Sequence, residues 1–279
     1  MDIFGIDFTS SPSRRKPITS VFCRLTGNVL SQESVQNWSA FDEFEAALER
    51  PGPWICGIDF PFGQSRRFVE NIGWRQDWSW YVAHVQGLGR NGFRDALNDY
   101  KRDRLAGDKE HRRATDHRAG SISPQKLHGI PVGLMFFEGA TRLNRSDVTI
   151  PLLKRGDPNK IVVEAYPGIL ARSLINRRSY KNDTKSKQTA DRMAARLDLM
   201  EQILGGALES TYGLRVEADS ALAADPTGDQ LDALFCAIQA AWAWTQRDDW
   251  FGAPLKVDPL EGWICDPHCR CETSEARQV

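Results

Sequence analysis

Acidic residues close three apolar segments of the sequence that have the composition of buried strands. Asp7 ends the run IFGID, Asp59 ends the run WICGID, and Glu164 ends the run IVVE. A single Asp after a strand is common, because Asp also starts turns. Open α/β sheets, however, bind their ligands at the carboxyl ends of strands. We therefore expect these three carboxylates to meet at one edge of a sheet.

Two further carboxylates lie at the start of the segment GDQLDALFCAIQAAW. At 100° per residue, its large apolar residues fall on one side and its Ala and Cys residues on the other, which predicts a fully buried helix. Asp229 and Asp232 lie near the stripe of small residues, where the helix can approach a sheet most closely. Asp229 also has a structural explanation, because an acid in the first turn interacts favourably with the helix dipole. Asp232 is harder to explain in that way.

Together these residues would form a cluster of oxygen ligands at Asp7, Asp59, Glu164, Asp229 and Asp232. Hard oxygen ligands select Mg²⁺ or Mn²⁺ over zinc or copper. Two such ions about 4 Å apart can activate a water molecule and stabilise the leaving oxygen of a phosphodiester. The predicted chemistry is metal-dependent phosphodiester hydrolysis, in which Asp7, Asp59, Glu164 and Asp232 are the catalytic residues.

The framework that positions these acids is expected to be an α/β fold with a mixed sheet of about five strands. Strands are expected at five places: residues 3–8, 18–25, 29–30, 54–60 and 160–167. Helices are expected at three: residues 40–49, 189–204 and 225–244. A helix that connects two strands usually makes them parallel. The two copies of Gly-Ile-Asp-Phe, at residues 5–8 and 57–60, should therefore point in the same direction.

Residues 64–156 differ from this pattern, and their spacing of Trp and charged residues predicts an α-rich insertion. We expect residues 1–250 to form one domain and residues 251–279 to form a C-terminal tail. The tail contains a Cys-x-x-His-Cys-x-Cys motif, formed by Cys265, His268, Cys269 and Cys271. Because no second ligand pair lies at the usual distance, the motif leaves zinc binding open.

Composition and charge limit the possible functions. The chain has 279 residues, of which 41% are hydrophobic, and this is enough for one large α/β domain. No run approaches the ~20 apolar residues of a membrane span. Six mostly separated cysteines favour reduced thiols and a cytoplasmic location. The net charge of −1 argues against bulk electrostatic coating of nucleic acid, but residues 88–118 and 172–196 carry a local excess of Lys and Arg.

The order of these segments resembles the ribonuclease-H-like superfamily, which includes the Holliday-junction resolvases. More closely, GIDFTSSPSRRKP, GIDFPFG, VVEAYPG and GDQLDALFCAIQAAW resemble a family of predicted ribonuclease-H-like nucleases, domain of unknown function family 429. RRATD, at residues 112–116, is similar to an Arg-x-x-Asp segment of that family. The likeness spans most of residues 1–250. It implies a ribonuclease-H-like fold and a Mg²⁺- or Mn²⁺-dependent nuclease, with Asp7, Asp59, Glu164 and Asp232 at the motif positions.

A nuclease also needs cations beside its acidic site, because carboxylates alone would repel phosphate. The candidate substrate-binding residues are Arg112, Arg113, Asp116, Arg177 and Arg178. The expected partner is a nucleic acid, either DNA or RNA.

Two alternative functions stay open. Actin-like and sugar-kinase ATPases share the strand order, and a polar first hairpin such as residues 9–17 holds phosphates in them, which would make this chain an ATP-linked phosphotransferase or phosphohydrolase. The sequence shows no second α/β domain of the kind that closes over ATP, and it contains no Walker loop. The other alternative is a catalytically inactive module in which the acids are structural and the basic stretches bind nucleic acid.

Overall fold

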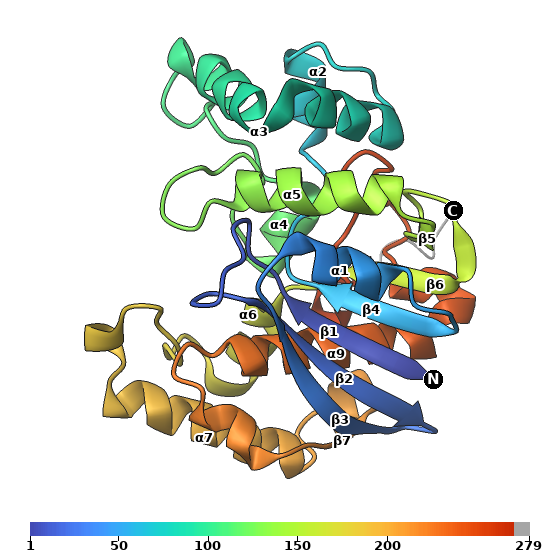
Figure 1. The fold of residues 1–279 in the computed structure, drawn as a ribbon, viewed down its shortest axis with the longest axis vertical. Coiled ribbons are helices and arrows are strands. Elements are labelled where there is room, and N and C mark those ends of the chain that lie inside the picture. Colours follow the sequence, from blue (N-terminus) through green and yellow to red (C-terminus); the bar gives the residue numbers. More distant parts are fainter. Residues whose placement is uncertain (271–279) are drawn as a thin grey trace, which may run out of the picture.

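The centre of the molecule is a seven-stranded mixed sheet, seen in a computed structural model that describes residues 1–270 (Figure 1). The strand order is β5-β6-β4-β1-β2-β3-β7. The strands are β1 (Asp2–Asp7), β2 (Ile18–Thr26), β3 (Val29–Trp38), β4 (Trp54–Ile58), β5 (Val148–Thr149), β6 (Asp157–Glu164) and β7 (Arg215–Glu217). The predicted α/β class is confirmed, but the prediction of five strands is wrong. The two additional strands are at the edges of the sheet, and with two and three residues they are too short to show a periodic pattern.

The five longer strands are contiguous in the sheet. β1 pairs in parallel with β4, and β4 pairs in parallel with β6, whereas β1, β2 and β3 form an antiparallel meander. Gly5 lies opposite Gly57, so the two Gly-Ile-Asp-Phe copies run side by side in register, as predicted. β3 is longer than expected because its second half is mostly polar and solvent-exposed, which removes the apolar alternation of a half-buried strand.

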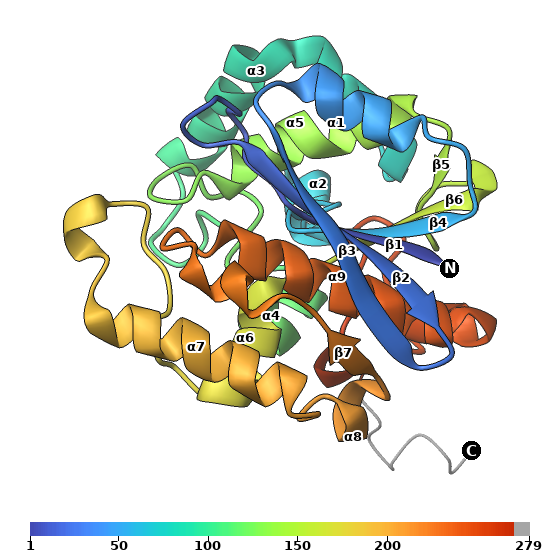
Figure 2. The same cartoon turned by 60° about the horizontal axis from the view of Figure 1, so that its bottom comes forward.

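Helices cover both faces of the sheet. The face that carries Ile6 and Ile58 is covered by α1 and by helices between β4 and β6, and the opposite face by α9, α6 and α7 (Figures 1 and 2). The α-helices are α1 (Phe41–Leu48), α2 (Arg66–Asn71), α3 (Trp78–Arg102), α4 (Ala114–Ala119), α5 (Val132–Arg145), α6 (Pro167–Ile175), α7 (Ala190–Leu204), α8 (Glu209–Tyr212) and α9 (Asp229–Thr245). Short 3-10 helices lie at Lys185–Lys187, Ser220–Ala224, Arg247–Gly252 and Pro267–Cys269. Residues 64–156 contain α2 to α5 and the short strand β5.

The central helix α9 is buried almost all round and lies directly on the backbone of β1 and β4. A Cβ atom built on Gly5 would lie 1.9 Å from the carbonyl oxygen of Ala233, and one built on Gly57 would lie 2.3 Å from that of Cys236. The helix can reach the sheet because small residues face the two glycines. This contact fixes the start of α9, and with it Asp229 and Asp232, relative to the strand ends.

Residues 251–270, which were expected to form a tail, return to the sheet. Ile264 forms a parallel bridge with Glu164, and the backbone N–H of Cys265 donates to the Glu164 carbonyl oxygen at 2.8 Å. Leu260, Trp263 and Ile264 are buried. Within the described residues, the helices are too short or too polar to span a membrane.

Candidate functional site

Asp7 and Asp59 follow the two central parallel strands and lie next to each other. β1 and β4 pair with Ile6 opposite Ile58, and the backbone N–H of Asp59 donates to the Ile6 carbonyl oxygen at 3.0 Å. Side chains alternate between the two faces of a sheet. Because Ile6 and Ile58 point towards α1, the two residues that follow them point towards α9. The structure thus brings these two predicted acids together on the α9 face.

The first turn of α9 adds two more acids from the same side. The helix begins after Gly228, whose φ of 77° lets the chain turn sharply into it. The Asp232 carboxylate is fully buried; it accepts a hydrogen bond from the Tyr180 hydroxyl at 2.5 Å and forms an ion pair with the Lys181 ammonium group. Asp229 lies close enough to Asp7 to raise the pKa of that carboxyl. Four of the five predicted metal ligands therefore share one region.

Glu164 lies on the other face of the sheet. It pairs with Ile58 rather than with Asp59, so its side chain points away from α9. Both of its carboxylate oxygens accept hydrogen bonds from the Arg113 guanidinium group, at 2.5 and 2.7 Å, and one also accepts from the Phe62 backbone N–H. A difference of one residue in register thus separates Glu164 from the acids with which the sequence grouped it.

The RRATD segment places its residues in two different environments. Arg113 is 1% exposed, and Asp116, which is equally buried, accepts hydrogen bonds from its guanidinium group and from Ser121. Arg112, by contrast, is exposed. Arg113 and Asp116 therefore hold α4 against β6 and are not accessible to a substrate.

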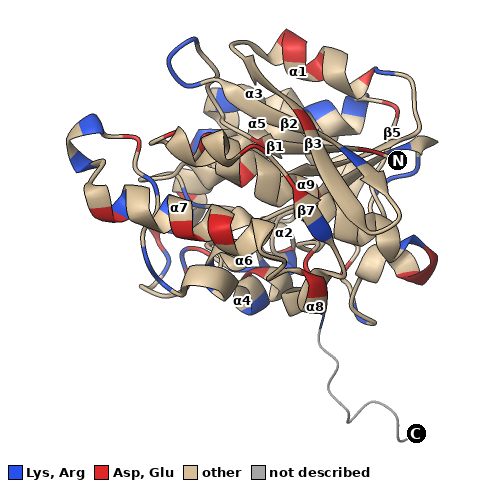
Figure 3. Ribbon diagram, turned by 90° about the horizontal axis from the view of Figure 1, so that it is seen from below, with Lys and Arg blue, Asp and Glu red and all other residues tan. Residues whose placement is uncertain are grey.

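A pocket of about 540 Å³ opens beside Asp7, Asp59, Asp229 and Asp232, which we call the acidic floor. Its lining combines two carboxylates, four cationic side chains and two tyrosines: Asp59, Asp232, Arg172, Arg177, Arg178, Lys181, Tyr166 and Tyr180. The predicted substrate residues Arg177 and Arg178 are exposed at this pocket. Figure 3 colours the ribbon blue at the Lys and Arg positions of the segment between α6 and α7. Sequence reasoning missed Arg172, Tyr166, Tyr180 and Lys181. The excess of Lys and Arg over residues 172–196 was the available signal for two of them.

Burial and mutual repulsion shift the acids away from their ordinary behaviour. Burial, reinforced by Asp229 and Asp59, raises the pKa of Asp7 well above its usual value, although Lys181 opposes the shift. Burial raises the pKa of Asp59 to about 6, again against the effect of Lys181. The pKa of Asp229 is raised for the same reason. Burial is the main cause of all three shifts, and repulsion by nearby carboxylates adds to it.

The donor chemistry of this floor fits Mg²⁺ or Mn²⁺, because its ligands are carboxylate oxygens in excess of the nearby ammonium groups. With the side chains as placed, residues 1–270 contain no group of three or more His, Cys, Asp or Glu that could hold a metal ion. The positive charge among the acids comes instead from Lys181, which is ion-paired with Asp232.

The C-terminal cysteine motif gives no metal centre in the described residues. Cys265 and Cys269 are buried, and burial raises the pKa of both thiols. His268 is held by the Asp266 carboxylate at 2.8 Å through Nδ1. Cys271, the fourth residue of the motif, lies outside the described residues.

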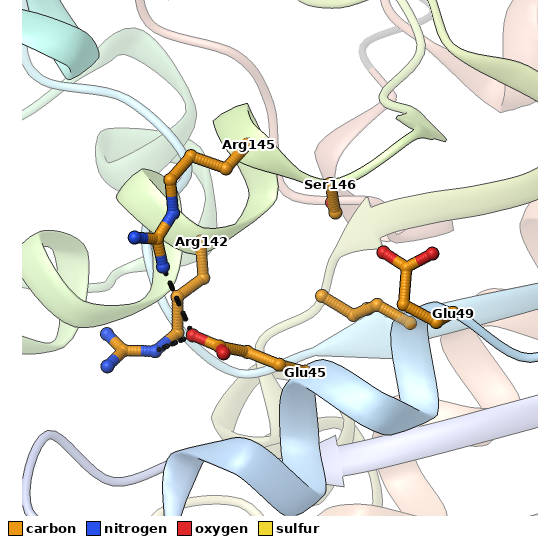
Figure 4. A pocket seen from close by; sticks show the side chains of 6 residues that line it. Glu45, Glu49, Arg142, Arg145 and Ser146 are labelled. Atoms are coloured by element: carbon orange, nitrogen blue, oxygen red, sulfur yellow. Dashed lines mark hydrogen bonds and ion pairs between the residues drawn. The ribbon is translucent and has the colours of Figure 1, made fainter.

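A second hollow, of about 310 Å³, lies between α1 and α5 (Figure 4). Its charged groups already neutralise each other, since Glu45 forms ion pairs with Arg142, at 2.9 Å from Nε, and with Arg145, at 3.1 Å. At the first pocket, Lys181 and Arg178 are also ion-paired, with Asp232 and Asp198, but the exposed Arg177 forms no ion pair within the described residues.

Comparison with known proteins gives a family match. A family model described as "Protein of unknown function (DUF429)" matches residues 5–254. The match contains Asp7, Asp59, Asp229 and Asp232, and it confirms the predicted membership of domain of unknown function family 429. No curated protein and no solved structure matches the chain.

Proposed function

The chain belongs to the DUF429 family, and we propose that it hydrolyses phosphodiester bonds of nucleic acid with the help of Mg²⁺ or Mn²⁺. The observation that carries the proposal is the pocket in which Asp59 and Asp232, with Asp7 and Asp229 beside them, meet four cationic side chains. Acids alone would repel a phosphate, and cations alone would bind it without reaction. The combination suits the hydrolysis of an anionic ester.

The fold is compatible with the ribonuclease-H-like arrangement that the proposal includes. Its five central strands have the order β6-β4-β1-β2-β3, with an antiparallel meander and two parallel strands beyond β1. The candidate ligands follow β1 and β4 and begin α9, so rigid elements hold all of them. In this proposal, Glu164 supports the site from the other face and does not bind the ion.

Asp7, Asp59, Asp229 and Asp232 would hold the ion. When bound, the ion would supply a polarised water molecule and stabilise the leaving oxygen. Arg177 and Arg178, which line the pocket, would orient the phosphodiester. Tyr166, at the pocket wall, offers a ring to an unpaired base.

Metal binding should be visible in the thermal stability of the protein. We expect Mn²⁺ to raise the melting temperature in proportion to the logarithm of its free concentration. Asp7→Asn should be as stable as the wild type without metal, or more so, because it removes one of several repelling charges. It should show no response to Mn²⁺, and hydrolysis of single-stranded DNA or RNA should fall by about a hundredfold or more. Thermal melts and a cleavage assay measure both effects.

Asp2→Asn is the matched control, since Asp2 lies at the opposite end of the same strand and pairs with Arg24. It should keep both the metal response and the activity. If Asp7→Asn is destabilised by roughly 1 kcal/mol or more, and Mn²⁺ stabilises neither protein, then Asp7 is a structural hydrogen-bond acceptor and the proposed function is wrong.

Substrate binding should depend on the exposed arginines of the pocket. The double variant Arg177→Glu and Arg178→Glu is expected to weaken binding of single-stranded nucleic acid by tenfold or more at about 0.1 M salt. Each lost phosphate contact should also lower the slope of log affinity against log salt by roughly 0.7. Fluorescence anisotropy over a salt series gives both quantities.

The control for this charge reversal is Arg247→Glu with Lys256→Glu, two substitutions beyond the opposite end of α9. They change the net charge equally but should leave the affinity and its salt slope close to those of the wild type. Equal loss in both double variants would mean that overall charge, rather than the pocket, governs binding.

A further inference from the structure

Lys181 places a positive charge among the carboxylates of the acidic floor. Its ammonium group is ion-paired with Asp232 Oδ2, and the side chain reaches this carboxylate from the pocket that it lines. Among the neighbouring cations, it is also the first to oppose the raised pKa values of Asp7, Asp59 and Asp229. One lysine thus acts on all four candidate ligands.

Contacts on two sides hold the chain at Lys181. The buried Arg196 donates to the Tyr180 carbonyl oxygen at 2.9 Å and to the Ala223 carbonyl oxygen at 2.8 Å. On the other side, a Cβ atom at Gly228 would lie 2.7 Å from the Cβ of Lys181, so the start of α9 packs directly on it. The Tyr180 hydroxyl separately holds Asp232 in place.

The Lys181 side chain is partly exposed to solvent, whereas the Asp232 carboxylate is fully buried. Asp232 is 0% exposed, whereas the Lys181 side chain is 40% exposed, on the pocket side. The flexible four-carbon stem of a lysine can therefore swing into the pocket without unfolding any element. A divalent ion carries twice the charge of the ammonium group, so it would interact more strongly with the ionised form of these carboxylates.

We propose that Lys181 is a built-in counter-ion that competes with the divalent cation, so that the metal binds only when this ammonium group withdraws from Asp232 into the pocket. The inference rests on the proposed function, because it concerns the same metal site. The proposal also predicts that metal binding has a threshold concentration, because the ion must displace the Lys181 ammonium group.

The test compares Mn²⁺ affinities measured by isothermal titration calorimetry on the full chain. Lys181→Met and Lys181→Gln remove the charge, and both should bind Mn²⁺ about tenfold more tightly than the wild type, or better. Lys181→Arg keeps the charge and should show no gain. Lys185→Met removes an exposed charge from the same segment and should bind as the wild type does.

Asp232 loses its counter-ion in these variants, so melting curves without metal must show first that they fold. Lys181→Gln can still donate a hydrogen bond to Asp232, and it carries the test if Lys181→Met does not fold. Mn²⁺ binding to the wild type with equal or weaker binding to Lys181→Gln would overturn the proposal, because Lys181 would then be passive or helpful. A wild type that binds no Mn²⁺ would refute the proposed metal-dependent function itself, and the competition with it.

Discussion

Gly5→Ala and Gly57→Ala are each expected to destabilise the protein by about 4 kcal/mol or more, a loss large enough to unfold many domains. The added Cβ at Gly5 would lie 1.9 Å from the Ala233 carbonyl oxygen and 2.3 Å from the Ala237 backbone nitrogen. These are backbone atoms of a buried helix, so no side-chain rotation can relieve the overlap. Helix α9 would have to move away from the sheet and lose its close packing.

Urea unfolding measures this loss, and Gly87→Ala provides the control. Gly87 lies in α3, and no atom lies within 4 Å of a Cβ built there. Alanine favours a helix more than glycine does, so this variant should gain up to about 1 kcal/mol. If Gly5→Ala lies within about 1 kcal/mol of the wild type, the close contact between α9 and β1 described above is wrong.

The repeated Gly-Ile-Asp-Phe sequence therefore has a physical explanation in both copies. The glycines admit α9, and the Asp residues two positions later are directed to the same face by the alternation of side chains. The sequence did predict a buried α9 with a small-residue face for close approach, and the structure confirms both features. Patterns of period 2 and 3.6 within single segments carry this information.

Other features of the site depend on contacts that no local pattern describes. Glu164 ends an apolar strand just as Asp7 does, and only the register between β4 and β6 shows that it faces the other way. Lys181 follows no recognisable motif and lies in a segment without regular structure. It reaches Asp232 because Arg196 and Gly228 fix its backbone, and these contacts join residues 15 or more positions apart. The two edge strands were missed because they are too short to show alternation.

In the RRATD segment, too, a local pattern does not show which side chain is buried. The buried arginine of this segment gives the second large expected effect on stability. Arg112 and Arg113 are adjacent arginines, and no local pattern distinguishes their environments. The structure exposes Arg112 and buries Arg113 between two carboxylates. Burial raises the pKa of Glu164 although Arg113 opposes the shift, whereas at Asp116 the arginine outweighs burial and the pKa is lowered. Arg113 thus favours the ionised form of two buried acids.

Arg113→Met is expected to cost about 3–5 kcal/mol of unfolding free energy, because it leaves Glu164 and Asp116 buried without a cation. Arg112→Met should change stability by less than about 0.5 kcal/mol, as exposed substitutions usually do. Urea denaturation of the two neighbouring variants at pH 7 makes the comparison. A similar small loss in both would show that Arg113 is accessible, as a substrate-binding role would require.

The pH dependence of the Arg113→Met variant tests the cause of its instability. Without the guanidinium group, the folded-state pKa of Glu164 should lie further above its unfolded value, which is about 4.3. The folded state then binds more protons than the unfolded state, so the variant should become relatively more stable as the pH falls towards 4. Its deficit against the wild type should therefore be largest at neutral pH and smaller in acid. Combining Arg113→Met with Glu164→Gln removes one of the two buried charges, and the double variant should recover part of the loss at pH 7. A deficit that is independent of pH and unchanged by Glu164→Gln would mean that lost packing of the arginine stem, rather than an uncompensated carboxylate, destabilises the protein.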